Sequence, residues 1–308
     1  MAVVGFLWFA SSSVLSTYAD TRFLLIFDSS VAHTVIRFGS SATLGFVTRM
    51  LQPKKRTVQE TWQLMWGFRV QAACLFAANH MNSMALRLSG ITLCCVCKAS
   101  IPVLTVGLML LRGKRFEPMI YLSLMPAVLG VTLASISDVK FSWGGLVAAL
   151  GSALAQTLLN VTSKARLEQL EVSGPDAQFL MAAWCFLASI PMYLLSNSDV
   201  PPWSQAMQCP VALGVTILSG AAYHIEYVLN FMFIPCVNPL AFSVTDIARR
   251  LTKIVLGACF FHTVLTVPNM VGIVMALGGV LWYSCLKFNG SQDQAGRRKL
   301  MRMSSRFF

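Results

Sequence analysis

Long apolar stretches, each closed by a short polar segment, dominate the chain. A helix needs about 20 mostly apolar residues to cross a bilayer, and ten stretches meet that requirement. The ten expected spans cover residues 3–27, 30–51, 62–86, 90–111, 118–136, 142–163, 177–196, 210–234, 239–261 and 267–287. The connections between them are too short for a separate soluble domain. The pattern therefore predicts an all-α membrane protein with ten transmembrane helices.

The composition agrees with this interpretation. Of 308 residues, 56% are hydrophobic and 12% are charged, whereas a soluble domain carries about 25% charged residues. The net charge of +12 could indicate a nucleic-acid-binding protein. However, most basic residues lie in short segments between apolar stretches, so we exclude nucleic acid as a partner. The nine cysteines show no spacing typical of a disulfide framework or a metal site.

The basic residues of the connections predict the orientation. Fifteen Lys and Arg residues fall in the segments after even-numbered spans and in the tail, whereas only Arg87 and Lys140 fall on the opposite side. Positive charges accumulate on the cytoplasmic side of membrane proteins. We therefore expect both termini in the cytoplasm, which requires an even number of spans.

The first apolar stretch is not typical of a targeting signal. It is too long for the apolar region of a signal peptide, lacks a basic segment before it, and is too apolar for a transit peptide. We interpret it as the first membrane helix. The lack of an N-terminal extension favours the Golgi or endoplasmic reticulum over a plastid membrane.

The two halves of the chain look like copies of each other. Gly130 and Ala134 in the fifth span have counterparts in Gly272 and Ala276 of the tenth, and the fourth and ninth spans both carry basic residues. Five spans per copy place the copies in opposite orientations, as in many secondary transporters. We expect a first five-helix repeat at 1–137, a second at 138–288 and a basic cytoplasmic tail at 289–308.

Seven basic residues lie inside the expected spans. Arg22 and Arg37 are close enough to span ends to extend their charges to the interface. A Lys or Arg at the centre of a span costs about 2.5–3.5 kcal/mol, so Lys98, Arg249 and Arg250 require a partner or a function. The remaining two are Arg69 and Lys253.

Ion pairing inside the membrane explains only part of these charges. Asp246 lies one helical turn before Arg250, and Glu226 in the eighth span could pair with another basic residue. Two acidic groups leave a positive surplus in the interior. Guanidinium groups bind phosphate or carboxylate through paired hydrogen bonds, so an anion site is the preferred explanation and purely structural pairing the alternative.

Two polar stripes could line the same cavity. Tyr223, Glu226 and Tyr227 share one face of the eighth span, and Asn79 and Asn82 lie on the third. Each residue alone could simply form a hydrogen bond between helices. Together they favour a hydrated path.

Several of these residues resemble a known family, the triose-phosphate translocators of the nucleotide-sugar and drug/metabolite transporter superfamily. The resemblance runs through Lys98 and Pro102 in the first half. In the second half it covers Tyr223-His224, Asn238-Pro239, Ser243-Val244, Arg249-Arg250, Gly272 and Trp282-Tyr283-Ser284.

This resemblance implies two inverted five-helix repeats that exchange substrates by alternating access. It also implies that Lys98, Arg249 and Arg250 hold a phosphate group. The chain departs from the plastid pattern at Cys94, Cys95 and Ile101, and has asparagines at 79 and 82. Glu226 replaces a phosphate-binding tyrosine, so it must be paired or protonated to tolerate an anion, and proton coupling is one hypothesis.

The sequence thus predicts an antiporter that exchanges a phosphorylated metabolite, a sugar phosphate or nucleotide sugar, for phosphate or a nucleotide monophosphate. Expected partners are these substrates and membrane lipid, with a dimer left open; no cofactor, metal or enzymatic activity is expected. One alternative is a trafficking factor that does not transport. Another is an intramembrane enzyme, for which Glu226 and Asp246 form the candidate carboxylate pair.

Overall fold

A computed structural model gives the fold and describes residues 2–50, 57–113, 115–136, 141–170, 172–196, 209–233, 249–250, 252–260 and 266–304. All regular structure within these ranges is helical. The elements are α1 (Ala2–Ala10), the π-helical turn η1 (Ser11–Leu15), α2 (Ser16–Phe27), α3 (Ser30–Met50), α4 (Val58–Gly67), α5 (Arg69–Lys98), α6 (Ile101–Leu111), α7 (Pro118–Ile136), α8 (Trp143–Leu170), α9 (Gly174–Leu195), α11 (Pro210–Phe233) and α13 (Val267–Ser304). Residues 249–250 and 252–260 are also helical.

Local sequence explains several helix ends. Thr57 and Glu60 form a reciprocal capping box at the start of α4. Ser173 caps α9 by accepting a hydrogen bond from the Asp176 backbone N–H at 3.3 Å. The last turn of α2 ends at Asp28, which adopts a left-handed conformation with φ +42°, and α3 begins two residues later.

The third and fourth expected spans form a broken helical segment. Gly90 interrupts α5 with φ +80° and ψ −172°, and it is the first residue of the expected fourth span, directly after the connection at 87–89. Only glycine adopts this conformation readily. The chain then bends by 56° between Lys98 and Ile101. The fourth span is therefore split into the end of α5 and the short helix α6.

Among the described residues, four helices are long and apolar enough to cross a membrane, and the bent pair α5–α6 makes a fifth candidate. The four are Trp143–Ser163, Gly174–Leu195, Pro210–Asn230 and Val267–Leu286. The chain is thus an integral membrane protein whose described regular structure is entirely helical. The full set of ten spans is not reached by this test, partly because α3 is rich in polar residues and the expected ninth span is described only from residue 249.

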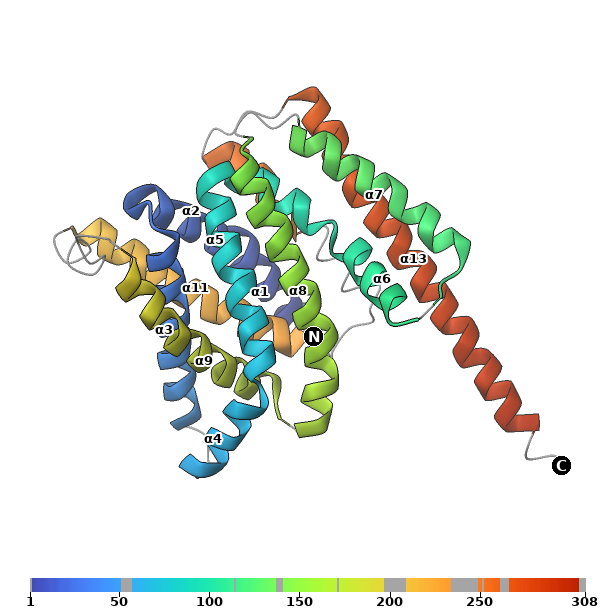
Figure 1. Cartoon of the computed structure of the whole chain (residues 1–308), viewed down its shortest axis with the longest axis horizontal. Coiled ribbons are helices and arrows are strands. Elements are labelled where there is room, and N and C mark those ends of the chain that lie inside the picture. The colour runs from blue at the N-terminus through green and yellow to red at the C-terminus, as the bar shows by residue number, and fades with distance from the viewer. Residues whose placement is uncertain are drawn as a thin grey trace.

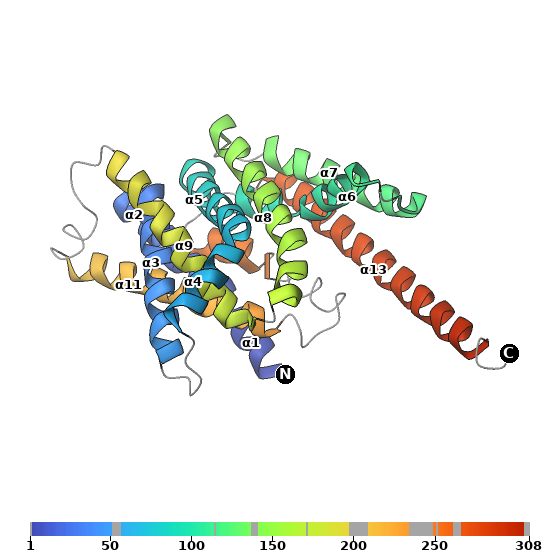
Figure 2. The same cartoon turned by 60° about the horizontal axis from the view of Figure 1, so that its bottom comes forward.

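The helices pack in defined pairs. Helix α5 lies along α8, α3 packs against both α9 and α11, and α11 also contacts α1 and α2. Helices α7 and α13 lie side by side at the other end of the molecule in both views (Figures 1 and 2). Helix α13 continues past its partner into the basic tail as far as Ser304.

Glycines allow α7 and α13 to approach closely. A Cβ atom at Gly130 would lie 2.6 Å from the Gly272 carbonyl oxygen, and one at Gly272 would lie 2.8 Å from the Gly130 carbonyl oxygen. Gly279 meets Ala127 in the same way. Residue numbers rise along one helix as they fall along the other, so the two helices are antiparallel.

Candidate functional site

The centre of the candidate site is an ion-pair cluster on α11. Glu226 Oε1 lies 2.8 Å from Arg249 Nη1 and 3.8 Å from Lys253 Nζ. All three side chains are largely buried, with the Glu226 side chain 12% exposed. The carboxylate is therefore neutralised by two cations, as the sequence required if Glu226 was to tolerate an anionic ligand.

Lys98 approaches this cluster from the broken fourth span. It is the last residue of α5 and immediately precedes the 56° bend into α6. Its ammonium group is repelled by the charges of Arg250 and Lys253. No acidic side chain that the structure describes lies within ion-pair distance of Lys98.

Among the described side chains of this interior, basic residues outnumber acidic ones. The basic residues are Arg37, Lys98, Arg249, Arg250 and Lys253. Among the described side chains, only Asp20 and Glu226 supply negative charge to them. Lys98 lies beside other cations and has no described acidic partner, so this low-dielectric interior favours binding of an anion.

Aromatic and amide groups adjoin the cluster. The rings of Tyr223 and Tyr227 are 4.6 Å apart between centroids. The Asn79 amide donates to the Tyr227 hydroxyl at 3.4 Å and to the Leu75 carbonyl oxygen at 3.0 Å. Asn82 lies half-buried almost one turn further along α5. The two polar stripes predicted from the sequence therefore meet through Asn79 and Tyr227.

The sequence analysis missed a second ionic network that borders the first. Asp20 Oδ1 lies 3.1 Å from His33 Nε2 and accepts a hydrogen bond from the Ser219 hydroxyl at 3.1 Å. Asp20 Oδ2 lies 3.5 Å from Arg37 Nη2. The Arg37 guanidinium in turn lies over the Tyr223 ring, 4.3 Å from its centroid. Helices α2, α3 and α11 are thus joined by one buried carboxylate.

Two expectations about basic residues were wrong. Arg37 does not extend to the membrane interface, because its side chain is 7% exposed and paired with Asp20. Arg69 does not belong to the interior cluster, because it lies exposed at the start of α5 and donates to the Trp66 carbonyl oxygen. The expected pairing of Asp246 with Arg250 falls outside the described residues.

A sequence signal for the missed network did exist. Asp20 is an acidic residue within an apolar stretch, and an intramembrane acid usually has a basic partner. Pairing Asp20 with Arg37 would have brought Arg37 into the interior. The positions of His33 and Ser219 carry no comparable signal, because a single His or Ser in a span is most often a local hydrogen-bonding group.

The arrangement can bind an anion between the two halves of the chain. The part of the chain that the structure describes contains no group of three or more His, Cys, Asp or Glu residues that could hold a metal ion. The donors that the described site does present are guanidinium, ammonium and hydroxyl groups.

Comparison with known proteins places these residues in context. The sequence profile of the Triose-phosphate Transporter family matches residues 1–284. The chain is 30% identical over 247 residues to phosphoenolpyruvate/phosphate translocator 3, chloroplastic, of Oryza sativa subsp. japonica, covering 73% of this chain and 63% of that protein. It is 24% identical over 288 residues to phosphoenolpyruvate/phosphate translocator 1, chloroplastic, of Arabidopsis thaliana, covering 91% and 70%.

Another relative carries a sugar phosphate in its name. Xylulose 5-phosphate/phosphate translocator, chloroplastic, of Arabidopsis thaliana is 27% identical over 199 residues, which cover 61% of this chain and 47% of that protein. The chain therefore spans about half to two thirds of the length of most of these relatives. A protein of known crystal structure aligns with 92% of the chain at a TM-score of 0.56 and 16% identity, which shows the fold alone.

The predicted compartment gains no support from these comparisons. The relatives are named as chloroplastic proteins, whereas the sequence favoured the Golgi or endoplasmic reticulum. Nucleotide sugars do not appear among the names of these relatives. Both points remain predictions.

Proposed function

The chain belongs to the Triose-phosphate Transporter family, and we propose that it is a secondary-active antiporter exchanging a phosphorylated metabolite for phosphate. The relatives are named as translocators of phosphoenolpyruvate or sugar phosphates against phosphate. On this proposal the protein is a transporter and not an enzyme. The cluster around Glu226 is its substrate site.

The position of Lys98 beside other cations carries the proposal. Glu226 forms ion pairs with Arg249 and Lys253, and Asp20 forms an ion pair with Arg37. Lys98 faces further cations instead of a described carboxylate. A bound phosphate dianion would supply negative charge beside Lys98, and its binding would reduce the repulsion of Lys98 by Arg250 and Lys253.

The break in the fourth span supports the same assignment. Transporter sites often use discontinuous helices, whose N-termini attract anionic groups through the helix dipole. Lys98 lies at such a break, just before the N-terminus of α6 at Ile101. An anion there would meet the Lys98 ammonium and the first free N–H groups of α6 together.

We assign roles to the remaining residues on this basis. Lys98, Arg249 and Arg250 would hold the phosphate, and Lys253 would share Glu226 with Arg249. The polar residues Asn79, Asn82, Tyr223 and Tyr227 would contact the rest of the substrate. With these roles, one substrate could contact the ionic cluster through its phosphate and the adjoining aromatic and amide groups through its remaining atoms.

Helix packing supports two inverted repeats at 1–137 and 138–288. In such a pair of repeats, the first span of the chain corresponds to the sixth, and the third span corresponds to the eighth. The third span lies in α5 and the sixth in α8, and these two helices are in contact. The equivalent contact is between the eighth span, in α11, and the first span, in α1 and α2, and it is also present. The pairs α3–α9 and α7–α13 map onto themselves. A pseudo-twofold axis between the repeats would give alternating access through rocking of one repeat against the other.

Counter-exchange in proteoliposomes tests the proposal. Vesicles preloaded with phosphate would be offered labelled phosphoenolpyruvate, xylulose 5-phosphate, glucose 6-phosphate or triose phosphate. Parallel vesicles would carry nucleotide monophosphates and be offered nucleotide sugars. We expect uptake that requires an internal partner, and loss of at least about tenfold in Arg250→Ala, since one charged hydrogen bond is worth about 1.5–3 kcal/mol.

Arg87→Ala is the matched control. Arg87 pairs with Asp28 at 3.7 Å, and the Asp28 side chain is 82% exposed, so this variant removes the same charge away from the cluster. Exchange that survives in both variants would reject the phosphate clamp and favour the trafficking-factor alternative. Success of only the nucleotide arm would retain the antiporter and change its substrate class.

A further inference from the structure

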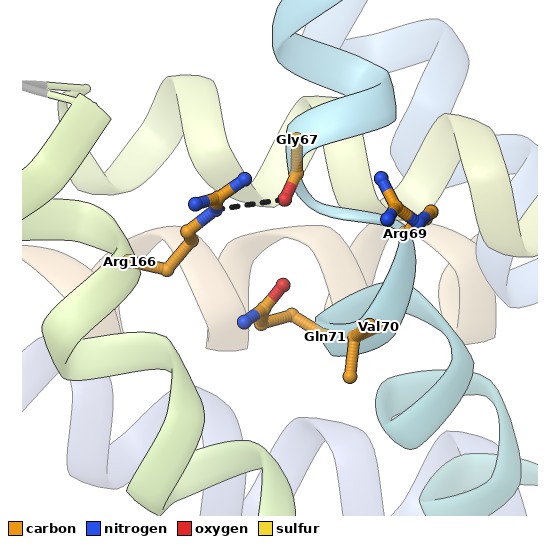
Figure 3. A pocket seen from close by; sticks show the side chains of 5 residues that line it. All are labelled: Gly67, Arg69, Val70, Gln71 and Arg166. Carbon is orange, nitrogen blue, oxygen red and sulfur yellow. Dashed lines mark hydrogen bonds between the residues drawn. The ribbon is translucent and has the colours of Figure 1, made fainter.

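A small basic pocket lies apart from the candidate substrate site. It has a volume of about 200 Å³ and is lined by Gly67, Arg69, Val70, Gln71 and Arg166. Figure 3 shows the two arginines approaching from opposite sides, Arg69 from the start of α5 and Arg166 from the C-terminal part of α8. The Arg166 Nε atom donates to the carbonyl oxygen of Gly67, the last residue of α4, at 2.9 Å, which ties α8 to the end of α4.

The two guanidinium groups have no acidic partner among the side chains that the structure describes. Arg69 donates from Nη1 to the Trp66 carbonyl oxygen at 3.3 Å, and Arg166 donates from Nη1 to Gln169 Oε1 at 3.2 Å. The other contacts described for them are with the Gly67 carbonyl oxygen for Arg166 and the Trp66 ring for Arg69. Two guanidinium forks facing a shared space are suited to a phosphate group.

Gln71 adds a buried hydrogen-bond acceptor to the pocket. Gln71 is 6% exposed, yet its Oε1 atom has no hydrogen-bond partner in the described structure. The Nε2 atom donates to the Thr162 carbonyl oxygen at 3.5 Å, and the opposite orientation of the amide would place two oxygens together. A buried acceptor without a partner is destabilising. A ligand with a hydroxyl or amine donor would satisfy it.

Tryptophans place this pocket at the depth of lipid headgroups. Trp62 and Trp66 are 55% and 52% exposed, and both rings contact the ring of Trp184 at centroid distances of 6.2 and 5.5 Å. Exposed tryptophans gather at the membrane–water interface. The Arg69 guanidinium lies 5.6 Å from the Trp66 ring centroid, so the basic pocket adjoins this aromatic group.

We propose that this pocket binds a phosphate-bearing group that also carries a hydroxyl or amine donor, as phospholipid headgroups do. The guanidinium groups of Arg69 and Arg166 hold the phosphate, and Gln71 Oε1 accepts from the donor. Basic pockets between helices on the cytoplasmic side are typical headgroup sites. The bound group joins α5 to α8 and stabilises the fold. The inference stands apart from the proposed transport function.

Native mass spectrometry and thermal unfolding test the inference on the full chain. The protein would be prepared in phosphatidylcholine alone, or with phosphatidylinositol, phosphatidylglycerol or phosphatidic acid. We expect retained phosphatidylinositol or phosphatidylglycerol and a rise in Tm of about 3 °C. Inorganic phosphate and glycerophosphoinositol form the soluble arm. Stabilisation by these at equal concentration that is lost in Arg69→Gln would assign the pocket to a soluble phosphate ester, since phosphate at the proposed substrate site would stabilise both proteins equally.

Three variants make the test specific. Arg69→Gln removes one guanidinium whose protein contacts are local, and should lower retention at least about tenfold. Gln71→Met should abolish the preference for phosphatidylinositol over phosphatidic acid. Arg112→Gln removes an exposed charge at the end of α6 and should change neither. Absence of retention above phosphatidylcholine in the unaltered protein, or equal retention in Arg69→Gln, would overturn the inference.

Discussion

Gly130 and Gly272 lie backbone to backbone, and each would place a Cβ atom within 2.8 Å of the other's carbonyl oxygen. The relation is reciprocal in a further respect, because Gly130 also meets the backbone of Ala276 while Gly272 meets that of Ala134. These are the residues that the sequence paired as counterparts in the two halves. A twofold axis through this contact is what two inverted repeats would produce.

Gly130→Ala is therefore expected to destabilise the protein. The added methyl group would press on the backbone of α13, which cannot move as a flexible side chain can, and overpacking costs about 1–3 kcal/mol. Gly278→Ala is the matched control, because nothing lies within 4 Å of that position and alanine favours helix. Thermal unfolding in detergent should show a lower Tm for Gly130→Ala alone. Equal Tm values would mean that α7 and α13 are not in this contact.

Neutralising both partners of the Glu226–Arg249 pair should be better tolerated than neutralising one. Arg249→Gln or Glu226→Gln alone leaves a buried charge with less compensation, and each should lower Tm. The double variant should recover most of that loss. Phosphate exchange should stay low in the double variant if Arg249 also contacts substrate. Recovery of both quantities would give Arg249 a purely structural role.

Glu226→Gln also tests proton coupling. A cycle that protonates Glu226 would lose its pH dependence in this variant, because glutamine cannot titrate. Exchange would be measured with and without an imposed pH gradient, using Arg87→Ala as the reference. An unchanged pH profile would reject coupling through Glu226.

Lys98→Gln should stabilise the empty protein and abolish its response to phosphate. Lys98 is repelled by Arg250 and Lys253, so removing its charge relieves that repulsion. We expect Tm to rise by about 2–4 °C without ligand, while the stabilisation by added phosphate disappears. A residue with only a packing role would lower Tm when replaced. A fall in Tm together with normal phosphate stabilisation would contradict the assignment.

Asp20→Asn should be among the most destabilising single substitutions. It would leave Arg37 buried without its carboxylate, and breaking such a pair costs about 3–5 kcal/mol. Asp28→Asn, at an exposed pair with Arg87, should cost about 0–1 kcal/mol. Folded yield and Tm measure both effects. Partial rescue by Asp20→Asn with Arg37→Gln would identify the lost charge balance as the cause.

The predicted orientation can be checked by cysteine labelling. Cys209 is exposed at the start of α11, on the side expected to face away from the cytoplasm. In a variant retaining only this cysteine, an impermeant maleimide should label intact cytoplasm-out vesicles poorly and opened vesicles fully. Arg112→Cys in the cysteine-free background should label in both. The opposite pattern would invert the topology.

The sequence was sufficient for the membrane-embedded helical character and for the family. Long apolar stretches have no other stable environment than a bilayer, and there the backbone must form helices because no water can satisfy it. The residues around Lys98 and Arg249-Arg250 carried the resemblance that the match over residues 1–284 confirmed. The break near Gly90 was also placed correctly, because polar Arg87 and Ser89 interrupt the apolar pattern there.

Only the tertiary structure decided which charges meet. Asp20 and Arg37 are 17 positions apart on different helices, and Glu226 and Arg249 are separated by 23, so their pairing depends on helix packing. The same packing brought Arg37 into the interior and moved Arg69 out to the pocket with Arg166. Hydrophobic patterning fixes how far each residue lies along its own helix. Contacts between side chains far apart in the chain determine which face of a helix packs against its neighbour. These contacts therefore also determine the electrostatics of the site.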